Sequence, residues 1–187
     1  KYAIATHTHA DHITGCFTLK EETNCEYVMW KDTASLGVSK YVDENSSLTF
    51  GGESIKFHHV PGHTADSMIL EVDNHIFTGD FLFTGKGGVG RDDLPSGRME
   101  EHWNSLVSLS KFSGHVMVQT GHDPPGTKMQ TLEWNREHNP ILSMHSWEQY
   151  RDWQNNSVKQ LGYVSKMKVA LPANIFGEIP DVIPWLE

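Results

Sequence analysis

Three histidines and an aspartate lie within residues 6–12, which read Thr-His-Thr-His-Ala-Asp-His. Imidazole nitrogen is the commonest protein ligand for transition metals near neutral pH, and carboxylate oxygen adds a harder donor. The preceding residues 2–5 form a short apolar run, Tyr-Ala-Ile-Ala, that is typical of a buried strand. A buried strand that ends in a polar loop places such side chains at the edge of a sheet. The segment therefore predicts a metal site rather than a solvated chance cluster.

Three more ligand-type residues follow apolar, β-rich segments further along the chain. His63 follows residues 54–60, Asp80 ends residues 75–80, and His122 ends residues 116–122. Each is preceded by a glycine, as is common where a strand gives way to a turn. A single histidine or aspartate at a strand end is more often a capping or solvated group. The segment 6–12 followed in order by His63, Asp80 and His122 predicts one shared metal site.

Composition narrows the class of protein. A chain of 187 residues with 37% hydrophobic content predicts one compact domain, residues 1–187, with a core of its own. No apolar run approaches the ~20 residues that span a bilayer. The net charge of −9, with no basic cluster to offset it, argues against a nucleic-acid partner. Cys16 and Cys25 fit neither a disulfide framework nor a zinc knuckle, so we expect Cys16 to be buried and the compartment to be reducing.

The order of expected elements favours a mixed α/β (α+β) layered domain. We expect strands over residues 1–5, 26–30, 48–50, 55–60, 68–72, 75–78 and 116–120. We expect helices over residues 11–22, 34–41, 99–112, 127–137 and 146–155, and a loop over residues 81–95. Gly51-Gly52 and Asp73-Asn74 predict tight hairpin turns. The helix over residues 99–112 should be buried along the side that carries Trp103, Leu106, Leu109 and Phe112.

The motif H-x-H-x-D-H, followed in order by His63, Asp80 and His122, resembles the metallo-β-lactamase superfamily. Further segments are similar to its persulfide dioxygenase (sulfur dioxygenase) branch: His9-Ala10-Asp11-His12-Ile13-Thr14-Gly15, Pro61-Gly62-His63-Thr64, Phe77-Thr78-Gly79-Asp80, Gly90-Arg91-Asp92-Asp93, Gly121-His122-Asp123, Asn139-Pro140 and Pro172-Ala173-Asn174. The resemblance implies an αββα sandwich with its metal site at one edge of two facing sheets. Because that fold has strands before the metal loop, we expect the chain to be truncated at its N-terminus.

For this branch, the resemblance implies one Fe²⁺ per chain, held by His7, His63 and Asp80 as a 2-His-1-carboxylate triad. Four further residues would orient these ligands and hold water: His9, Asp11, His12 and His122. Asp11, His12 and His122 would also have catalytic roles. The implied reaction is the oxidation of glutathione persulfide by O₂ to sulfite and glutathione.

The same residue types leave two other functions open. In a dinuclear zinc hydrolase of the glyoxalase II type, two Zn²⁺ would activate a hydroxide that cleaves a thioester. His7, His9 and His63 would hold one zinc. Asp11, His12 and His122 would hold the other, with Asp80 as the bridge. The third reading is a non-catalytic subunit of a larger assembly that retains the fold. The branch-specific segments favour iron over zinc, and the intact ligand set disfavours the third reading.

The glycine-rich segment 85–91 lacks the spacing of a phosphate-binding P-loop. Its last residue, Arg91, is the expected substrate-binding residue, because guanidinium pairs with carboxylates and glutathione carries two. Pro124 stands where relatives in this branch usually carry a tyrosine, which leaves the exact persulfide open. The resemblance also implies the mitochondrial matrix for a eukaryotic chain and the cytoplasm for a bacterial one. It is compatible with a homodimer.

Overall fold

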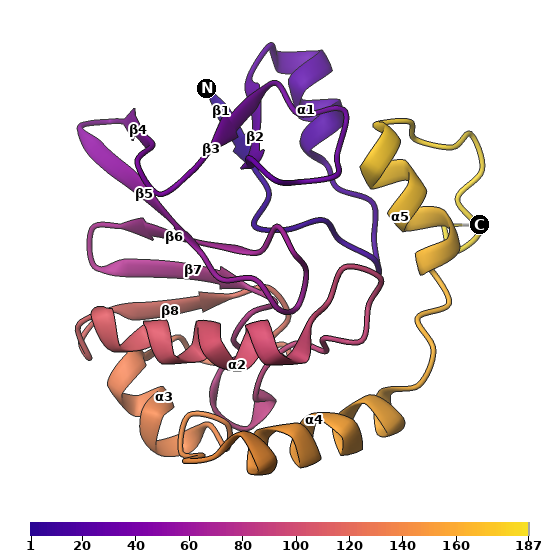
Figure 1. Cartoon of the computed structure of the whole chain (residues 1–187). Helices are drawn as coiled ribbons and strands as arrows, with labels where there is room; N and C mark the ends of the chain where they lie inside the picture. Colours follow the sequence, from indigo (N-terminus) through magenta and orange to yellow (C-terminus); the bar gives the residue numbers. More distant parts are fainter. Residues whose placement is uncertain (187) are drawn as a thin grey trace.

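Two β-sheets face each other in the computed structural model, which describes residues 1–186 (Figure 1). The first sheet has three parallel strands in the order β1 (Tyr2–Ile4), β2 (Glu26–Trp30) and β3 (Lys40–Val42). The second sheet has six strands in the order β4 (Ser47–Phe50), β5 (Glu53–His59), β6 (Met68–Val72), β7 (His75–Gly79), β8 (Met117–Thr120) and β9 (Gln130–Thr131). Within the second sheet only β7 and β8 pair in parallel.

Helices cover the outer side of each sheet (Figure 1). Helix α1 (Cys16–Thr23) lies against the first sheet. Helices α2 (Met99–Val107), α3 (Leu132–His138) and α4 (Trp147–Leu161) lie on the side of the second sheet, and α5 (Met167–Phe176) returns to the side of α1. Short 3₁₀ turns span Gly85–Gly87 and Ser108–Lys111. No helix within residues 1–186 has the length and apolar character needed to cross a membrane.

Three buried clusters correspond to the three interfaces between these layers. Strand β2 shows how the alternation of its side chains builds two of them. Tyr27 and Met29 pack with Phe17 of α1, whereas Val28 and Trp30 point to the opposite face and pack against the second sheet. The third cluster joins the second sheet to the outer helices and includes Ile69, Ile76, Val118, Leu106, Leu132 and Tyr150. The predicted αββα layering is therefore confirmed.

Several local expectations are also confirmed. Gly51 and Gly52 both have positive φ in the turn between β4 and β5, and Asp73 has φ 49° in the turn between β6 and β7. Cys16 is buried at the start of α1. The expected apolar side of residues 99–112 is buried, although the helix changes to a 3₁₀ turn at Ser108.

Other helix expectations were wrong. Residues 34–41 form turns and strand β3, because Gly37 packs against the ring of Phe17 and Lys40 pairs with β2. The helix expected over residues 127–137 begins only at Leu132, where the side chain of Thr131 accepts a hydrogen bond from Trp134 N. The helix expected to end at residue 155 continues to Leu161.

The helix expected over residues 11–22 begins only at Cys16, and α5 was not expected at all. The two errors have different causes. Residues 9–14 are kept out of a helix by the side chain of Asn174, which lies in α5. Helix α5 contains Pro172 in its interior, and a proline there normally argues against a helix because it lacks an N–H donor.

Candidate metal centre

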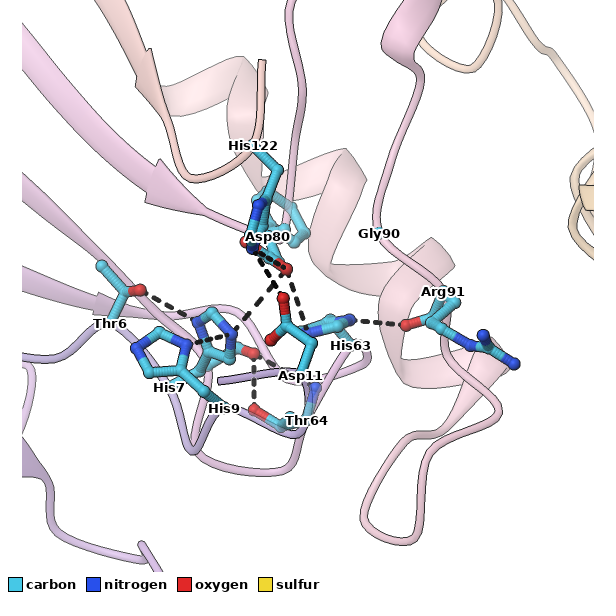
Figure 2. A network of polar contacts seen from close by, with 12 residues as sticks. Thr6, His7, His9, Asp11, His63, Thr64, Asp80, Gly90, Arg91 and His122 are labelled. Atoms are coloured by element: carbon cyan, nitrogen blue, oxygen red, sulfur yellow. Dashed lines mark hydrogen bonds and ion pairs between the residues drawn. The ribbon is translucent and has the colours of Figure 1, made fainter. Parts of the chain in front are cut away.

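The four predicted elements meet at one edge of the sandwich, where their polar side chains converge (Figure 2). Residues 6–12 follow β1 of the first sheet. The other three positions belong to the second sheet: His63 lies between β5 and β6, Asp80 follows β7, and His122 follows β8. Because strand ends of both sheets meet here, side chains more than 110 residues apart in sequence become neighbours.

His7, His63 and Asp80 form a compact buried group. Nε2 of His7 lies 4.0 Å from Oδ2 of Asp80, and Nε2 of His63 lies 3.7 Å from the same oxygen. One ligand atom from each residue lies within 4.8 Å of the other two. Two imidazole nitrogens and one carboxylate oxygen at this spacing fit a single divalent transition metal.

Hydrogen bonds on the far side of each ring orient the two histidines. Nδ1 of His63 lies 2.6 Å from the carbonyl oxygen of Arg91, which can only accept, so this nitrogen carries the proton. Nδ1 of His7 lies 3.0 Å from Oγ1 of Thr6. In both rings Nε2 faces Asp80, and in His63 the proton on Nδ1 leaves the lone pair of Nε2 available, which is the arrangement that metal ligation requires.

His9, Asp11, His12 and His122 lie beside this group. Nδ1 of His9 is 3.0 Å from Nε2 of His7. Nε2 of His122 is 3.2 Å from Oδ2 of Asp11 and 3.6 Å from Oδ2 of Asp80. His9, Asp11 and His12 make up a second group whose ligand atoms lie within 4.8 Å of one another. The structure thus brings all seven predicted ligand-type residues together, and the second group gives room for a second ion.

The protonation of these side chains follows from burial and from their mutual charges. Burial, with the neighbouring His9 and His63, holds the pKa of His7 well below its usual range. Burial lowers the pKa of His9 to about 4. The hydrogen bond with Asp11 raises the pKa of His122 to about 9. Burial raises the pKa of Asp80. His7 and His9 are therefore neutral, as ligands must be.

Glycines allow the backbone to approach the candidate ligands closely. A Cβ atom on Gly90 would lie 2.1 Å from the carbonyl oxygen of Asp80 and 2.9 Å from Nδ1 of His63. A Cβ atom on Gly121 would lie 2.3 Å from Oδ1 of Asp80. Both contacts are shorter than any side chain tolerates, so these positions require glycine.

Two residues hold the loops of the site in place, and sequence reasoning gave neither of them this role. Asp66 accepts hydrogen bonds from Thr8 N and from the hydroxyls of Thr8, Thr33 and Thr64, so it joins the 6–12 loop to the loop that carries His63. Asn174 accepts from Thr14 N at 2.8 Å and donates to the carbonyl oxygens of His9 and His12 at 2.8 and 2.9 Å. The Pro-Ala-Asn segment was a family signal for Asn174, but nothing local indicated its contacts.

A cavity of about 430 Å³ opens beside the candidate ligands and is lined by His63, Asp80 and His122. Arg91 also lines it, but its guanidinium is already engaged. Nε and Nη2 donate to the carboxylate of Asp93 at 2.6 and 2.7 Å, and Nη1 donates to the carbonyl oxygen of Gly162 at 2.8 Å. Sequence reasoning missed the rest of the wall, which includes Lys86 and, from the helical segment, Trp153, Ser157 and Gln160. The expected helix ended at residue 155, so it included Trp153 but neither Ser157 nor Gln160, and the side that faces the cavity was not predicted.

Comparison with known proteins identifies the family. The family model described as "Metallo-beta-lactamase superfamily" matches residues 1–122, and the chain belongs to this superfamily. Among curated proteins, it is similar to the mitochondrial persulfide dioxygenases ETHE1 of Mus musculus (28% identical over 178 residues) and Homo sapiens (29% over 178 residues). Each match covers 93% of this chain and 68% of the relative, and the match to the Bos taurus protein covers 57% of that relative. The hydroxyacylglutathione hydrolase of Idiomarina loihiensis is 32% identical over 120 residues, which is 64% of this chain and 46% of that protein.

Solved structures agree with the fold. The crystal structure of ETHE1 from Myxococcus xanthus matches with a TM-score of 0.84 and 28% identity, covering 93% of this chain and 76% of that one. A metallo-beta-lactamase from Staphylococcus aureus matches with a TM-score of 0.83 at 21% identity, covering 95% of this chain and 57% of that one. The resemblance to persulfide dioxygenases that was read from the sequence is therefore confirmed.

Proposed function

We propose that this protein is an iron-dependent persulfide dioxygenase that oxidises glutathione persulfide with O₂ and water to sulfite and glutathione. The observation that carries the proposal is the buried group of His7 Nε2, His63 Nε2 and Asp80 Oδ2 at the base of an open cavity. Three protein ligands leave other coordination positions for substrates, as in 2-His-1-carboxylate iron oxygenases. The similarity to named persulfide dioxygenases supports this use of the site.

In this proposal each side chain has a distinct task. His7, His63 and Asp80 would hold the iron, which when bound supplies the redox chemistry with O₂. Arg91 O keeps His63 in the tautomer that presents Nε2, and the contact of Thr6 Oγ1 with Nδ1 orients the ring of His7. His122 and Asp11, 3.2 Å apart, form a charged hydrogen-bonded pair at the mouth of the site that can hold water and accept or return a proton. His9 and His12 are the other polar side chains beside the proposed ligands.

Arg91 remains the proposed anchor for a substrate carboxylate. Its contacts with Asp93 and Gly162 leave N–H groups on Nη1 and Nη2 that no described residue accepts from. The side chain is therefore fixed in place at the cavity wall before substrate arrives, which lowers the entropy cost of binding.

Metal analysis and oxygen uptake test the proposal together. We expect about one iron per chain in the purified protein and oxygen consumption that depends on glutathione persulfide. His63→Ala should lose both, since it removes one of only three ligands. His115→Ala is the control, because that side chain is 84% exposed. Iron that stays stoichiometric in His63→Ala would contradict the ligand assignment.

A dinuclear zinc thioester hydrolase is the second candidate, and a specific observation favours it. His9, Asp11 and His12 form their own ligand group, and hydroxyacylglutathione hydrolases are among the relatives. His12→Ala separates the two functions. With one iron, the variant should keep its metal and lose activity; with two zincs, it should lose about one ion per chain.

A chain that binds no metal would instead be the non-catalytic subunit. We further propose that residues 1–187 form a single domain. We also propose that a eukaryotic source would place the protein in the mitochondrial matrix and a bacterial source in the cytoplasm; the names of its mammalian relatives describe those proteins as mitochondrial.

A further inference from the structure

A second polar cluster is buried behind the candidate metal centre, on the side away from the cavity mouth. Asp92, which follows Arg91, meets His102 of α2 and Tyr150 and Gln154 of α4. All four side chains belong to buried residues, and those of Asp92 and His102 have no exposed surface. None of them takes part in the function proposed above.

Three atoms of this cluster lack a hydrogen-bond partner among the described residues: Oδ1 of Asp92, Nδ1 of His102 and Oε1 of Gln154. For His102 and Gln154, the hydrogen bond made by the other polar atom of the side chain shows whether the unpartnered atom is a donor or an acceptor. Nε2 of His102 lies 3.0 Å from the carbonyl oxygen of Phe81 and must donate to it. Nε2 of Gln154 donates to the carbonyl oxygen of Gly90 at 2.8 Å. The two remaining atoms of these side chains, Nδ1 and Oε1, are therefore acceptors.

An ionised Asp92 would make the third open atom an acceptor as well. Asp92 would then carry a buried negative charge that receives a described hydrogen bond from Tyr150 at Oδ2 and none at Oδ1. Arg91, the preceding residue, is already paired with Asp93. Buried polar groups without partners and buried unpaired charges are both strongly unfavourable. A proton on the carboxyl group removes the buried charge and adds a hydrogen-bond donor to the cluster.

We propose that Asp92 is a neutral carboxylic acid in the folded protein, buried beside His102, Tyr150 and Gln154, and that this cluster positions His63 from behind. Tyr150 completes it by donating from its hydroxyl to Oδ2 of Asp92 at 3.0 Å. Asp92 is thus a positioning residue that touches neither the metal nor the substrate.

The backbone of Gly90 and Arg91 connects this cluster to the candidate metal ligands His63 and Asp80. Arg91 O accepts the hydrogen bond that sets the tautomer of His63, and Gly90 N donates to Asp80 O at 3.0 Å. Gln154 donates to Gly90 O, and Tyr150 donates to the side chain of Asp92, so α4 holds this segment at both positions. Helix α2 supports the same region, since a Cβ atom on Gly62 would meet the backbone of His102 at 2.2 Å.

The charged groups around the cluster agree with a neutral acid. Burial raises the pKa of Asp92, and the charge of Asp93 on the same loop raises it further, against the hydrogen bonds of Gln154 and Tyr150. Burial lowers the pKa of His102 to about 3, against the hydrogen bond to the carbonyl oxygen of Phe81, so this ring is neutral. The two groups therefore do not form an ion pair, although Nδ1 lies 3.8 Å from Oδ2.

The sign of the pH dependence follows. A carboxyl whose pKa is raised on folding stabilises the folded state fully below its unfolded pKa, and this contribution is lost as the pH rises through the folded pKa. Asp92→Asn retains an acceptor for Tyr150 and supplies N–H donors, but it cannot ionise. We therefore expect Asp92→Asn to gain stability relative to the wild type as the pH rises from about 4 toward neutral and alkaline values.

The test uses the metal-loaded protein and three variants. Infrared spectra of wild type minus Asp92→Asn, taken near neutral pH, should contain the C=O stretch of a protonated carboxylic acid. The thermal midpoint of Asp92→Asn should lie within about 3 °C of the wild type, whereas Asp92→Leu, which lacks every hydrogen bond, should fall further. Metal affinity should be retained in Asp92→Asn and drop ten- to a hundredfold in Asp92→Leu, roughly the effect of losing a group that orients a ligand. Asp152→Asn, an exposed change on the same helix α4, should alter none of these.

The proposal is overturned if the difference spectrum has no acid band, or if Asp92→Asn is as destabilised as Asp92→Leu. A stability difference between Asp92→Asn and wild type that stays constant with pH would overturn it as well. The infrared and unfolding measurements do not depend on the reaction catalysed, so their failure is distinct from failure of the dioxygenase assignment.

Discussion

Single residues decide how closely the chain can approach the candidate ligands, and Gly90 is the clearest case. Its amide donates to Asp80 O while its α-carbon lies against the imidazole of His63. Any side chain here would push on both candidate ligands at once. Gly90 has no positive φ, so its requirement is for space and not for backbone freedom.

Gly90→Ala should therefore displace His63 and Asp80. We expect the free energy of unfolding to fall by about 1–3 kcal/mol, as for other overpacked sites, and the metal content to fall below half of wild type. Chemical denaturation and elemental analysis measure the two effects. Gly15→Ala is the matched control, because a Cβ atom there meets nothing within 4 Å. Equal metal content in the two variants would show that the site tolerates the added methyl group.

At the scale of whole elements, α5 acts as a clamp on the metal loop. Asn174, near the C-terminal end of α5, makes three hydrogen bonds with the backbone of residues 9–14. Its amide nitrogen donates to the carbonyl oxygens of His9 and His12, and its amide oxygen accepts from Thr14 N. The side chain is buried, so each bond that is lost leaves a buried backbone group without a partner.

Asn174→Ala should cost roughly 2–4 kcal/mol of stability, from the lost bonds and the unpaired groups they leave. Activity should fall as well, because the lost bonds fix the segment that carries His9, Asp11 and His12. Asn174→Asp should rescue little, since a carboxylate facing the carbonyl oxygens of His9 and His12 cannot donate. Urea denaturation and initial rates measure these effects, with the exposed Asn155→Ala in α4 as the control. A stable, fully active Asn174→Ala protein would rule out the clamp.

For the molecule as a whole, the metal should be part of what keeps the two sheets together. The candidate ligands come from both sheets, His7 from the loop after β1 and His63, Asp80 and His122 from the second sheet. Without an ion, neutral nitrogen lone pairs face a buried carboxylate across 3.7–4.0 Å. A bound ion therefore stabilises the folded state selectively, since the unfolded chain cannot assemble the site.

Chelation should accordingly destabilise the folded protein. When the free metal stands at a hundred to a thousand times its Kd, removal should lower the free energy of unfolding by about 3–4 kcal/mol. Thermal scans with and without chelator measure this shift, and adding iron back should reverse it. His63→Ala should not respond to either treatment, because it lacks a ligand. A wild-type midpoint that chelator leaves unchanged would mean that the ion contributes nothing to folding.

Much of the site was readable in the sequence because its signals are local. The apolar run before residue 6, the alternation before His63 and the glycines beside Asp80 and His122 each identify a strand that ends in a ligand-type residue. Hairpins at Gly51-Gly52 and Asp73-Asn74 follow from turn chemistry alone. Helix boundaries were less accurate. The region 34–41 has helix-compatible residues, yet its pairing with β2 and the contact of Gly37 with Phe17 decide its structure.

Hydrophobic period and ligand chemistry are properties of short segments, so local patterns predicted the residue types at the candidate metal site, their order and the layered fold. The folded structure was needed to show that Nε2 of both His7 and His63 faces Asp80 and that Arg91 O sets the tautomer of His63. It also revealed the hydrogen bonds of Asn174 with a loop some 160 residues earlier and the burial of Asp92 beside His102. Such contacts join segments that are distant in the chain, and no periodicity or spacing encodes which distant side chain will supply a missing hydrogen-bond partner.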